Sequence, residues 1–330
     1  MKKILVTGGA GFIGSHLVDK LIEKKYKVAI IDDFSGGSIK NCNKKAKVFK
    51  IDIRDFKKTE NAISSFKPEI VYHLAANAAE NKAQFSPVDI TSRNFDGSIK
   101  VLTASIRSGV KKFVFTSSIA VYGSLQTPFK EKDKAEPEDL YGISKLAFED
   151  SLKILSNVHK FKYVIARPHN VYGPRQNMQD PYRNVVTIFM NSILQNKPFY
   201  IYGKGNQRRC FSYIDDVVEA LVKCGSEKIN DMTFNIGSDG DYSVKELSGL
   251  ILKITKSDLK PINLPERPQE VKIAISDHKL SKKYLKYKDK TTLEKGLTKT
   301  WDWVQSEGYK KPKFDTVEID SPLLPKNWKK

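Results

Sequence analysis

Short apolar runs alternate with longer amphipathic stretches through the first half of the chain. The runs are bounded by polar or glycine-rich residues, as buried strands are, and they cover 3–7, 27–32, 48–51, 70–75, 111–117 and 163–167. Helix-like stretches lie between them at 11–24, 55–66, 87–108 and 139–157. Because strands that alternate with helices form βαβ units, we predict an α/β fold with a doubly wound parallel sheet.

The pattern becomes irregular after residue 167. Pro168, Pro174, Pro181 and Pro198 interrupt it, so we expect a smaller lobe that is built beside the sheet. From 309 to 330 the chain is rich in lysine and proline. We interpret this stretch as an extended C-terminal tail with no chemistry of its own, in which Trp328 packs against the rest of the protein.

A glycine-rich segment follows the first predicted strand. Residues 4–14 combine a strand, a glycine turn and the start of a helix. Glycines allow a tight turn and let backbone N–H groups approach a pyrophosphate, which then faces the helix N-terminus. The spacing fits G-x-G-x-x-G if it starts at Gly9 and G-x-x-G-x-x-G if it starts at Gly8, and both patterns end on Gly11 and Gly14. The sequence does not choose between the two.

Acidic residues at strand ends extend this dinucleotide site. Asp32 ends the second predicted strand, 18 residues after Gly14, where a carboxylate accepts the hydroxyls of the adenosine ribose. A carboxylate there repels a 2′-phosphate, and Asp33 has the same charge, so we expect NAD rather than NADP. Asp52 ends the third strand, where an acid can accept from the adenine amine, and the residues after His73 are small enough to leave room for a cofactor.

Tyr141 and Lys145 lie four residues apart, on one face of the predicted helix 139–157. An ammonium group beside a phenol stabilises the phenolate and lowers its pKa from about 10, towards use as a general base. The same spacing begins at Tyr200, Tyr284 and Tyr309, so it is not specific by itself. Only Tyr141 follows the fifth strand, which ends near Ser118 at the sheet edge where ligands bind.

Composition and charge exclude several classes of protein. The net charge is +19, but 48 of the 57 basic residues are lysines that are spread along the whole chain, and no nucleic-acid-binding motif accompanies them. We therefore expect no nucleic-acid partner. No apolar stretch is long enough for a transmembrane helix, and Thr7–Gly11 breaks the N-terminal apolar run, which excludes a signal peptide. Three cysteines and five histidines show no ligand spacing, so we expect no metal and a reducing cytoplasm.

Five segments carry a family resemblance. They are Thr-Gly-Gly-Ala-Gly-Phe-Ile-Gly at 7–14, Phe-Thr-Ser-Ser-Ile-Ala-Val-Tyr-Gly at 115–123, Tyr-Gly-Ile-Ser-Lys at 141–145, Arg-Pro-His-Asn-Val-Tyr-Gly-Pro at 167–174 and Gly-Asn-Gln-Arg-Arg-Cys-Phe-Ser-Tyr-Ile-Asp-Asp at 205–216. In this order, over about residues 1–300, the chain resembles an extended short-chain dehydrogenase/reductase of the nucleotide-sugar epimerase/dehydratase family. Its motifs are most similar to those of UDP-hexose 4-epimerases.

The resemblance implies a domain organisation and an assembly. A Rossmann NAD-binding domain would occupy 1–167, and segments at about 205–236 would return to it. Residues 168–308 would form mainly the substrate-binding lobe, and 309–330 the tail. The resemblance also implies a homodimer whose interface is formed by the helices at 87–108 and 139–157.

The resemblance also assigns roles to matched residues. Ser118 would bind the sugar hydroxyl and help to move its proton, Tyr141 would be the base, and Lys145 would bind the nicotinamide ribose. The cofactor-binding residues would be Gly8, Gly11, Phe12, Ile13, Gly14, Asp32, Asp33, Asp52, Ile53, Leu74, Ala75, Ala76, Asn94, Tyr141 and Lys145. The residues that contact a UDP-sugar would be Ser118, Asn170, Asn184, Arg209, Arg267 and Ala274.

Three of these substrate contacts rest on further arguments. Arg209 and Arg267 resemble a diphosphate clamp, and a guanidinium fork matches phosphate oxygens as lysine does not. Ala274, seven residues after Arg267, would be a small gate residue that leaves room beside sugar C2 for an acetamido group. Cys210 stands where many relatives have Asp, and the sequence does not predict its effect.

Ser118 is followed by Ile119 and Ala120, with no carboxylate. This differs from the 4,6-dehydratases, which resemble Thr-Asp-Glu here, and from nucleotide-glucuronate decarboxylases, which usually have Glu. The GDP-mannose 3,5-epimerases need a cysteine where Ala120 stands and a lysine near Asn184. The resemblance therefore favours NAD-dependent inversion at C4 of a UDP-hexose through a 4-keto intermediate, with UDP-N-acetylhexosamines tolerated.

Several alternatives stay open. Related activities are a UDP-uronate epimerase or decarboxylase, a GDP-mannose 3,5-epimerase, a UDP-pentose epimerase and a nucleotide-ketosugar reductase. A dehydrogenase would form NAD(P)H and a reductase would consume it in stoichiometric amounts, and absorbance at 340 nm detects either change. A further class is a non-catalytic dinucleotide-binding protein, against which the presence of Ser118, Tyr141 and Lys145 argues.

Overall fold

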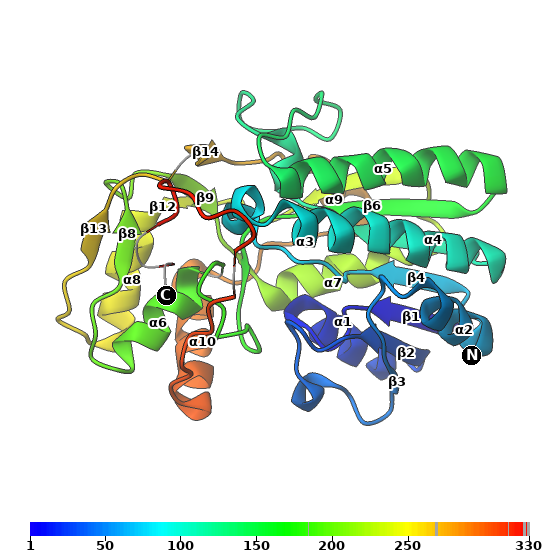
Figure 1. The fold of residues 1–330 in the computed structure, drawn as a ribbon, viewed down its shortest axis with the longest axis horizontal. Coiled ribbons are helices and arrows are strands. Elements are labelled where there is room, and N and C mark those ends of the chain that lie inside the picture. The colour runs from blue at the N-terminus through cyan, green and yellow to red at the C-terminus, as the bar shows by residue number, and fades with distance from the viewer. Residues whose placement is uncertain (184, 268–269, 316, 326–327, 329–330) are drawn as a thin grey trace.

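One parallel sheet organises the molecule (Figure 1). The computed structural model describes residues 1–183, 185–267, 270–315, 317–325 and 328. Seven strands of this part pair in the order β11-β6-β5-β4-β1-β2-β3, all of them parallel. They are β1 (Lys3–Thr7), β2 (Lys27–Asp32), β3 (Lys47–Lys50), β4 (Ile70–His73), β5 (Lys112–Thr116), β6 (Lys162–Pro168) and β11 (Met232–Ile236). The predicted doubly wound sheet is confirmed.

Helices cover both faces of this sheet, which explains why its strands are apolar without alternation. On one face α1 (Phe12–Glu23) packs against α7 (Ile214–Cys224), and on the other α4 (Gly97–Arg107) packs between α2 (Phe56–Phe66) and α5 (Leu140–His159). Successive side chains of β1 point to opposite faces of the sheet. Ile4 and Val6 belong to the core under α1 and α7, whereas Leu5 belongs to the core under α2, α4 and α5.

The segment predicted as one helix over 87–108 is interrupted. It begins with α3 (Pro87–Thr91), widens into a π-helical turn (Ser92–Asp96) and continues as α4. The wide turn holds Asn94, whose amide nitrogen donates to the carbonyl of Asn77 at 2.9 Å and whose amide oxygen accepts from the N–H of Asn77 at 2.7 Å. The interruption thus fixes the loop that follows β4.

The lobe beside the sheet packs α6 (Val185–Ile193), α8 (Val244–Thr255) and α10 (Leu293–Glu307) together. Short strand pairs connect it to the rest: β7 (Val171–Tyr172) with β10 (Ser212–Tyr213), β8 (Tyr200–Tyr202) with β13 (Ile262–Leu264), and β9 (Arg208–Cys210) between β12 (Asp241–Ser243) and β14 (Ile273–Ala274). Helix α9 (Lys279–Leu285) instead packs against β11 and α7, on the sheet side. The segment 168–308 therefore contributes to both parts of the molecule.

A buried polar network joins α5 to the sheet. Arg167 on β6 donates from Nε and Nη2 to the two carboxylate oxygens of Glu149 on α5, at 2.9 and 2.5 Å. Its Nη1 donates to the hydroxyl of Tyr122 at 2.7 Å, which in turn donates to the side chain of Asn235 on β11 at 2.9 Å. Glu149 is fully buried and Arg167 is 4% exposed. A charge pair at this depth is stable only while both partners are present.

The first prediction tests this pair. Glu149→Gln leaves the Arg167 guanidinium without its counter-charge, so the free energy of unfolding in urea should fall by about 3 kcal/mol or more. The matched control is Asp150→Asn, which removes the same charge one residue along the helix from an exposed pair with Lys153. The free energy of unfolding of Asp150→Asn should stay within about 0.5 kcal/mol of the parental value. Equal losses in the two variants would contradict a structural role for the buried pair.

Candidate active site

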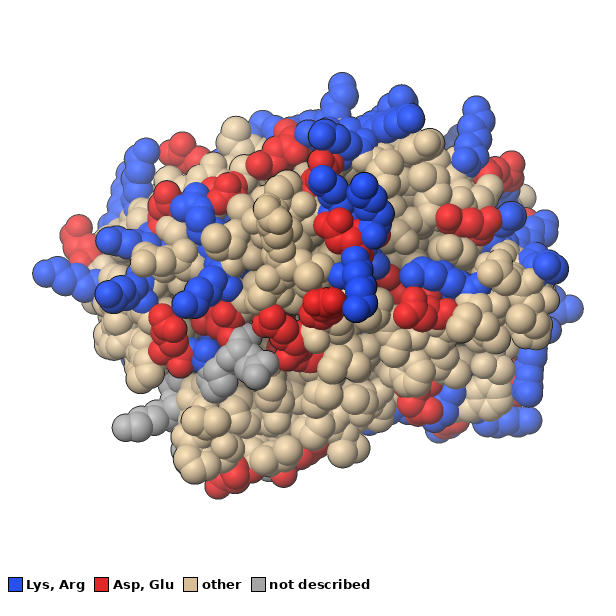
Figure 2. Space-filling view, turned by 90° about the horizontal axis from the view of Figure 1, so that it is seen from above, with Lys and Arg blue, Asp and Glu red and all other residues tan. Residues whose placement is uncertain are grey.

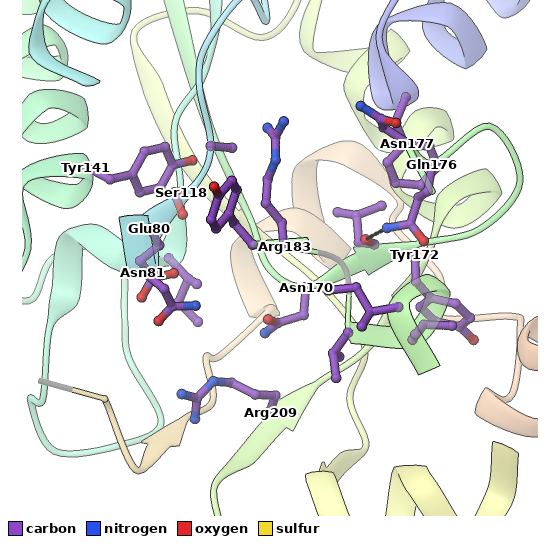
Figure 3. A pocket seen from close by; sticks show the side chains of 18 of the residues that line it. Glu80, Asn81, Ser118, Tyr141, Asn170, Tyr172, Gln176, Asn177, Arg183 and Arg209 are labelled. Atoms are coloured by element: carbon purple, nitrogen blue, oxygen red, sulfur yellow. Dashed lines mark hydrogen bonds between the residues drawn. The ribbon is translucent and has the colours of Figure 1, made fainter. Parts of the chain in front are cut away.

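A cavity of about 480 Å³ lies at the carboxyl edge of the sheet, between the sheet and the lobe. Its sheet side is lined where β1, β4 and β5 end, by residues that include Gly8, Leu74 and Ser118. This is the place where the strand order reverses, between β4 and β1, which is where doubly wound sheets bind ligands. The lobe contributes the facing wall, which includes Asn170 and Tyr172 (Figure 3).

The glycine turn leads directly from β1 into this cavity. Gly8 has φ +69°, and a Cβ on it would lie 2.7 Å from the backbone nitrogen of Ala75. A Cβ on Gly14 would lie 2.1 Å from the carbonyl oxygen of Gly8, so neither position accepts a side chain. Gly8, Gly11 and Gly14 line the cavity, whereas Gly9 packs against Ile30. The structure thus favours the spacing that starts at Gly8, which the sequence left open.

Helix α1 begins at Phe12, with Gly11 as its N-cap residue, and Phe12 and Ile13 also line the cavity. No side chain caps this end, and its first turn carries no acidic residue. The positive end of the helix dipole and its first N–H groups therefore face the cavity. This is the arrangement that binds a pyrophosphate.

The acids expected around the adenosine differ in their surroundings. Asp32 is buried beside the glycine turn, where its two oxygens accept from the N–H groups of Ala10 and Phe34 at 2.9 and 2.8 Å. Burial raises the pKa of Asp32. Each oxygen accepts one of these hydrogen bonds and has a lone pair left for a ribose hydroxyl.

Two other expected cofactor acids are paired with arginines. Asp33 accepts from Nη1 of Arg93 at 2.9 Å, and Asp52 accepts from Nε and Nη2 of Arg54 at 3.0 and 2.6 Å. The hydrogen bond from Arg54 lowers the pKa of Asp52. Both carboxylates are thus partly compensated by a guanidinium, and the expected contact of Asp52 with the adenine amine stays a prediction.

The remaining cofactor residues divide into two groups. Leu74 and Ala76 line the cavity. Ala75 instead donates its N–H to the hydroxyl of Thr7 at 3.2 Å, Ile53 is buried in the core on the α2 face, and Asn94 binds Asn77. None of these last three is among the described residues that line the cavity. Their expected contact with the cofactor stays a prediction.

Ser118, Tyr141 and Lys145 meet on one wall of the cavity (Figure 3). Ser118 begins the 3₁₀ helix η4 (Ile119–Tyr122), where its Oγ accepts from the N–H of Ala120 at 3.1 Å, and its side chain hydrogen-bonds Tyr141. Tyr141 lies in the first turn of α5. Lys145 places Nζ 5.7 Å from the centre of the Tyr141 ring and donates to the carbonyl of Thr116 at 2.9 Å.

The pKa of Tyr141 is raised rather than lowered, in contrast to the expectation from its spacing to Lys145. Burial is the main cause, and the hydrogen bond from Ser118 opposes it. Nearby carboxylates, Glu80 and Asp139, raise this pKa further because they repel a phenolate. Burial also lowers the pKa of Lys145 to about 7, which weakens the ammonium that was expected to tune the phenol.

The expected substrate residues are partly brought together. Asn170 lines the lobe wall, and Arg209 and Arg267 line the same end of the cavity. The Arg209 guanidinium is held by backbone carbonyls, among them that of Lys272 at 3.2 Å. Arg267 pairs with Glu270 at 2.6 Å and stacks over the Tyr202 ring at 4.4 Å. Asn184 lies outside the described residues.

Ala274 is the expected substrate residue that the structure places elsewhere. It is 7% exposed and belongs to a small buried cluster with Val121, Tyr122 and Phe129, and it is not among the described residues that line the cavity. It pairs in β14 with Arg209 of β9, so its strand supports the clamp. Ala274 therefore does not supply open space beside the sugar. Cys210, whose effect the sequence does not predict, is fully buried, and burial raises the pKa of its thiol to about 12.

The cavity residues that the sequence did not predict include Glu80, Asn81, Arg183 and Trp328. Glu80 and Asn81 begin the 3₁₀ helix η2 (Glu80–Phe85), beside Ser118 (Figure 3). Arg183 extends into the cavity from the lobe and pairs with Asp180. The scarcity of arginine, with nine in the chain, was a usable signal for Arg183. No motif marked Glu80 or Trp328.

Comparisons with known proteins agree with this site. The model of the NAD-dependent epimerase/dehydratase family matches residues 4–237, which span the glycine turn and the Ser118, Tyr141 and Lys145 wall. The chain belongs to this family. The expected family, the NAD cofactor and the expected class of enzyme, an NAD-dependent epimerase, are thereby confirmed.

Three relatives show what the chain is similar to. A UDP-glucose 4-epimerase from Thermotoga maritima, solved with UDP-glucose, has a TM-score of 0.88 and 38% identity and matches 92% of this chain and 99% of its own. A putative UDP-glucose 4-epimerase from Methanocaldococcus jannaschii is 36% identical, over 92% of this chain and 98% of its own. A UDP-N-acetyl-alpha-D-glucosaminuronate decarboxylase from Bacillus cytotoxicus is 31% identical, over 92% and 97%. The relatives thus share a family but not one reaction.

The described part of the chain has no concentrated basic stripe on the face drawn in Figure 2, no membrane-spanning helix and no metal-binding cluster. On the face in Figure 2, basic side chains are scattered among acidic ones rather than gathered in one stripe. No described helix is long and apolar enough to cross a membrane. Within the same residues, no group of three or more His, Cys, Asp or Glu is arranged to hold a metal ion.

The second prediction concerns the cofactor. Because Asp32 carries its charge beside the glycine turn, the protein should bind NAD at least about tenfold more tightly than NADP, a difference on the order of 1.4 kcal/mol. Asp32→Asn should narrow this difference, as measured by calorimetric titration of both dinucleotides. The control Asp55→Asn removes an equal charge from the exposed N-cap of α2 and should leave the ratio unchanged. A parent protein with equal affinity for both dinucleotides would refute the assignment of Asp32.

Proposed function

We propose that the protein inverts C4 of a UDP-hexose, with NAD as its cofactor, through a 4-keto intermediate. The observation that carries the proposal is the wall formed by Ser118, Tyr141 and Lys145, in which Ser118 is followed by the apolar residues Ile119 and Ala120. Oxidation and reduction at C4 need one base and a hydride carrier. Elimination and inversion at C3 and C5 need further acids or bases, which these two positions do not supply.

Each residue of the wall has its own role in the proposed reaction. Tyr141 takes the proton of the sugar O4 hydroxyl, and Ser118, which is hydrogen-bonded to Tyr141, orients that hydroxyl. Bound NAD supplies the hydride acceptor and a positive ring charge that favours ionised Tyr141. Arg209 and Arg267, which also line the cavity, hold the diphosphate. With the diphosphate fixed, the sugar can turn and present its other face before the hydride returns.

The charges near Tyr141 favour a neutral sugar. Glu80 and Asp139 lie close enough to raise its pKa, and burial together with Glu80 raises the pKa of Asp139 to about 7. A carboxylate at sugar C6 would add a further negative charge to this group and would make ionised Tyr141 less stable. Sugar hydroxyls, by contrast, can donate to Glu80. This argument supports a UDP-hexose over a UDP-uronate.

Arg183 favours a second candidate, a UDP-uronate 4-epimerase. Its guanidinium extends into the cavity (Figure 3) and is close enough to Tyr141 to lower its pKa, so it could pair with a sugar carboxylate. Asp180 already binds this guanidinium. The two candidates separate when UDP-glucose, UDP-N-acetylglucosamine and UDP-glucuronate are each incubated with the protein and the products are identified by NMR. That panel also tests tolerance of an acetamido group, for which Ala274 no longer gives a reason.

The third prediction concerns the base. Tyr141→Phe removes the group that accepts the O4 proton while the ring keeps the shape of the wall, so kcat should fall at least about 1000-fold. Binding of NAD and of the UDP-sugar, measured by calorimetry, should change little. Tyr163→Phe, on β6, is the matched control and should retain activity. Turnover near the parental rate in Tyr141→Phe would remove this residue from the mechanism.

We further propose a homodimer through α5. The outer surface of this helix exposes Ile143, Ile154 and Val158, which are 47%, 63% and 63% accessible. Exposed apolar residues along one helix mark an interaction surface, and a two-fold axis would pair two copies of α5. This surface lies on the far side of the helix from the sheet.

The fourth prediction follows from this surface. Ile154→Glu places a charge in the proposed interface and should convert dimer to monomer at micromolar concentration, as measured by light scattering. Ile39→Glu is the matched control, because Ile39 is 62% exposed but lies after β2, outside the helices proposed to pair. A monomeric parent protein, or a dimer that survives Ile154→Glu, would contradict the proposed interface.

A further inference from the structure

The C-terminal tail does not extend into solvent. After α10 it runs from the lobe across the junction between the lobe and the sheet domain, near α3 (Figure 1). The described part of this crossing, residues 309–315, 317–325 and 328, is named the strap below. The strap has hydrogen-bonded anchors on both sides of the cavity.

The lobe holds the first half of the strap through its backbone. The side chain of Asn191 accepts from the N–H of Lys310 at 3.1 Å and donates to the carbonyl of Lys310 at 2.8 Å. Three residues later, the N–H of Lys313 donates to the carbonyl of Gln179 at 2.8 Å. Bonds of this kind fix the path of a segment that has no regular structure of its own.

The sheet domain holds the second half of the strap. The N–H groups of Glu318 and Ile319 both donate to the carbonyl of Phe85, at 2.9 and 3.0 Å. The carboxylate of Glu318 accepts from the N–H groups of Val88 and Asp89 at the start of α3, both at 2.8 Å. These contacts fall at the end of η2, the turn whose first residues, Glu80 and Asn81, line the cavity.

An ion pair between a buried lysine and an exposed carboxylate adds a third anchor. Lys82 is 4% exposed and donates to Asp315 of the strap at 3.0 Å. Its ammonium also lies 5.3 Å from the centre of the Tyr182 ring, and the hydroxyl of Tyr182 donates to the carbonyl of Asp315. The strap therefore connects η2 to the turn at 180–183 of the lobe. The first segment carries Glu80 and the second carries Arg183, and both side chains are close enough to Tyr141 to act on its pKa.

Trp328 completes the wall at this end. It is 5% exposed, packs edge-on against Tyr182 at 4.9 Å and against Phe85 at 6.3 Å, and lines the cavity. Leu324 of the strap is buried in the same cluster. The cluster joins η2, which carries Glu80, to the turn that carries Arg183, so Trp328 lies where the strap crosses between these two segments.

We propose that the strap closes the sugar end of the cavity and that Trp328 is a specificity-determining wall of the sugar site. This proposal deepens the proposed function and rests on it for the identity of the ligand. An aromatic ring at this place covers the apolar face of a hexose and excludes water from the reacting C4. Closure also retains the 4-keto sugar while it turns.

The test compares two substitutions within the strap. Trp328→Ala removes the wall, whereas Leu323→Ala shortens an apolar side chain that is 67% exposed. On the NAD-loaded protein, calorimetry should show that Trp328→Ala binds UDP-glucose about tenfold or more weakly and binds UDP as tightly as the parent does. Its KM should rise more than its kcat falls. Trp328→Phe should restore part of the affinity, and Leu323→Ala should match the parent in every measurement.

Two further outcomes separate this proposal from the proposed function. If Trp328→Ala loses affinity for the UDP-sugar but the parent inverts none of the sugars tested, the role of the strap is supported and the proposed 4-epimerase activity is refuted. If the parent inverts C4 and Trp328→Ala has an unchanged KM and affinity, the 4-epimerase activity is supported and the role of the strap is refuted. Limited trypsin digestion supplies a readout without turnover, because UDP-glucose should slow cleavage in 309–313 more than UDP does. Equal protection by both ligands would overturn the closing role.

Discussion

The buried pair between Glu149 and Arg167 is the constraint on which the site depends. Helix α5 carries Tyr141 and Lys145, and this pair fixes its position on β6. The same guanidinium binds Tyr122, the last residue of η4, whose first turn is capped by Ser118. One planar, permanently charged group thus positions all three residues of the catalytic wall. Lysine, with one point charge, could not satisfy two carboxylate oxygens and a hydroxyl in these directions.

This pair also shapes the electrostatics of the site. The charge of Glu149 acts to raise the pKa of Lys145, against the larger effect of burial. Glu80 and Asp139 act on the opposite side and disfavour a phenolate at Tyr141. The wall therefore holds a protonated phenol until positive charge is brought beside it. In an epimerase of this family that charge comes with the oxidised cofactor, so the base is strongest when the hydride acceptor is in place.

Much of the fold followed from the sequence because buried parallel strands are apolar runs with a characteristic length. The strands at 3–7 and 27–32 have the predicted bounds, and the glycine turn, Tyr141 and Lys145 meet where the carboxyl edge of such a sheet requires. Pairing across the fold was not visible. The arginine that pairs with Asp33 is Arg93, 60 residues along the chain, and counting along a loop placed Ala274 in the cavity when its strand turns it into a buried cluster.

The composition of the tail does not reveal how the strap is held. A lysine- and proline-rich segment has too few apolar residues to form its own core, which is why it was interpreted as free of chemistry. Its position depends instead on a few residues, above all Trp328 and Leu324, that enter a cluster formed by Phe85 and Tyr182. The polar anchors add little, because partly exposed ion pairs contribute about 0–1 kcal/mol each. A segment held mainly by one small aromatic cluster opens at low cost compared with unfolding of the sheet. The strap is therefore suited to admit a ligand while the buried pair beneath it keeps the catalytic wall in place.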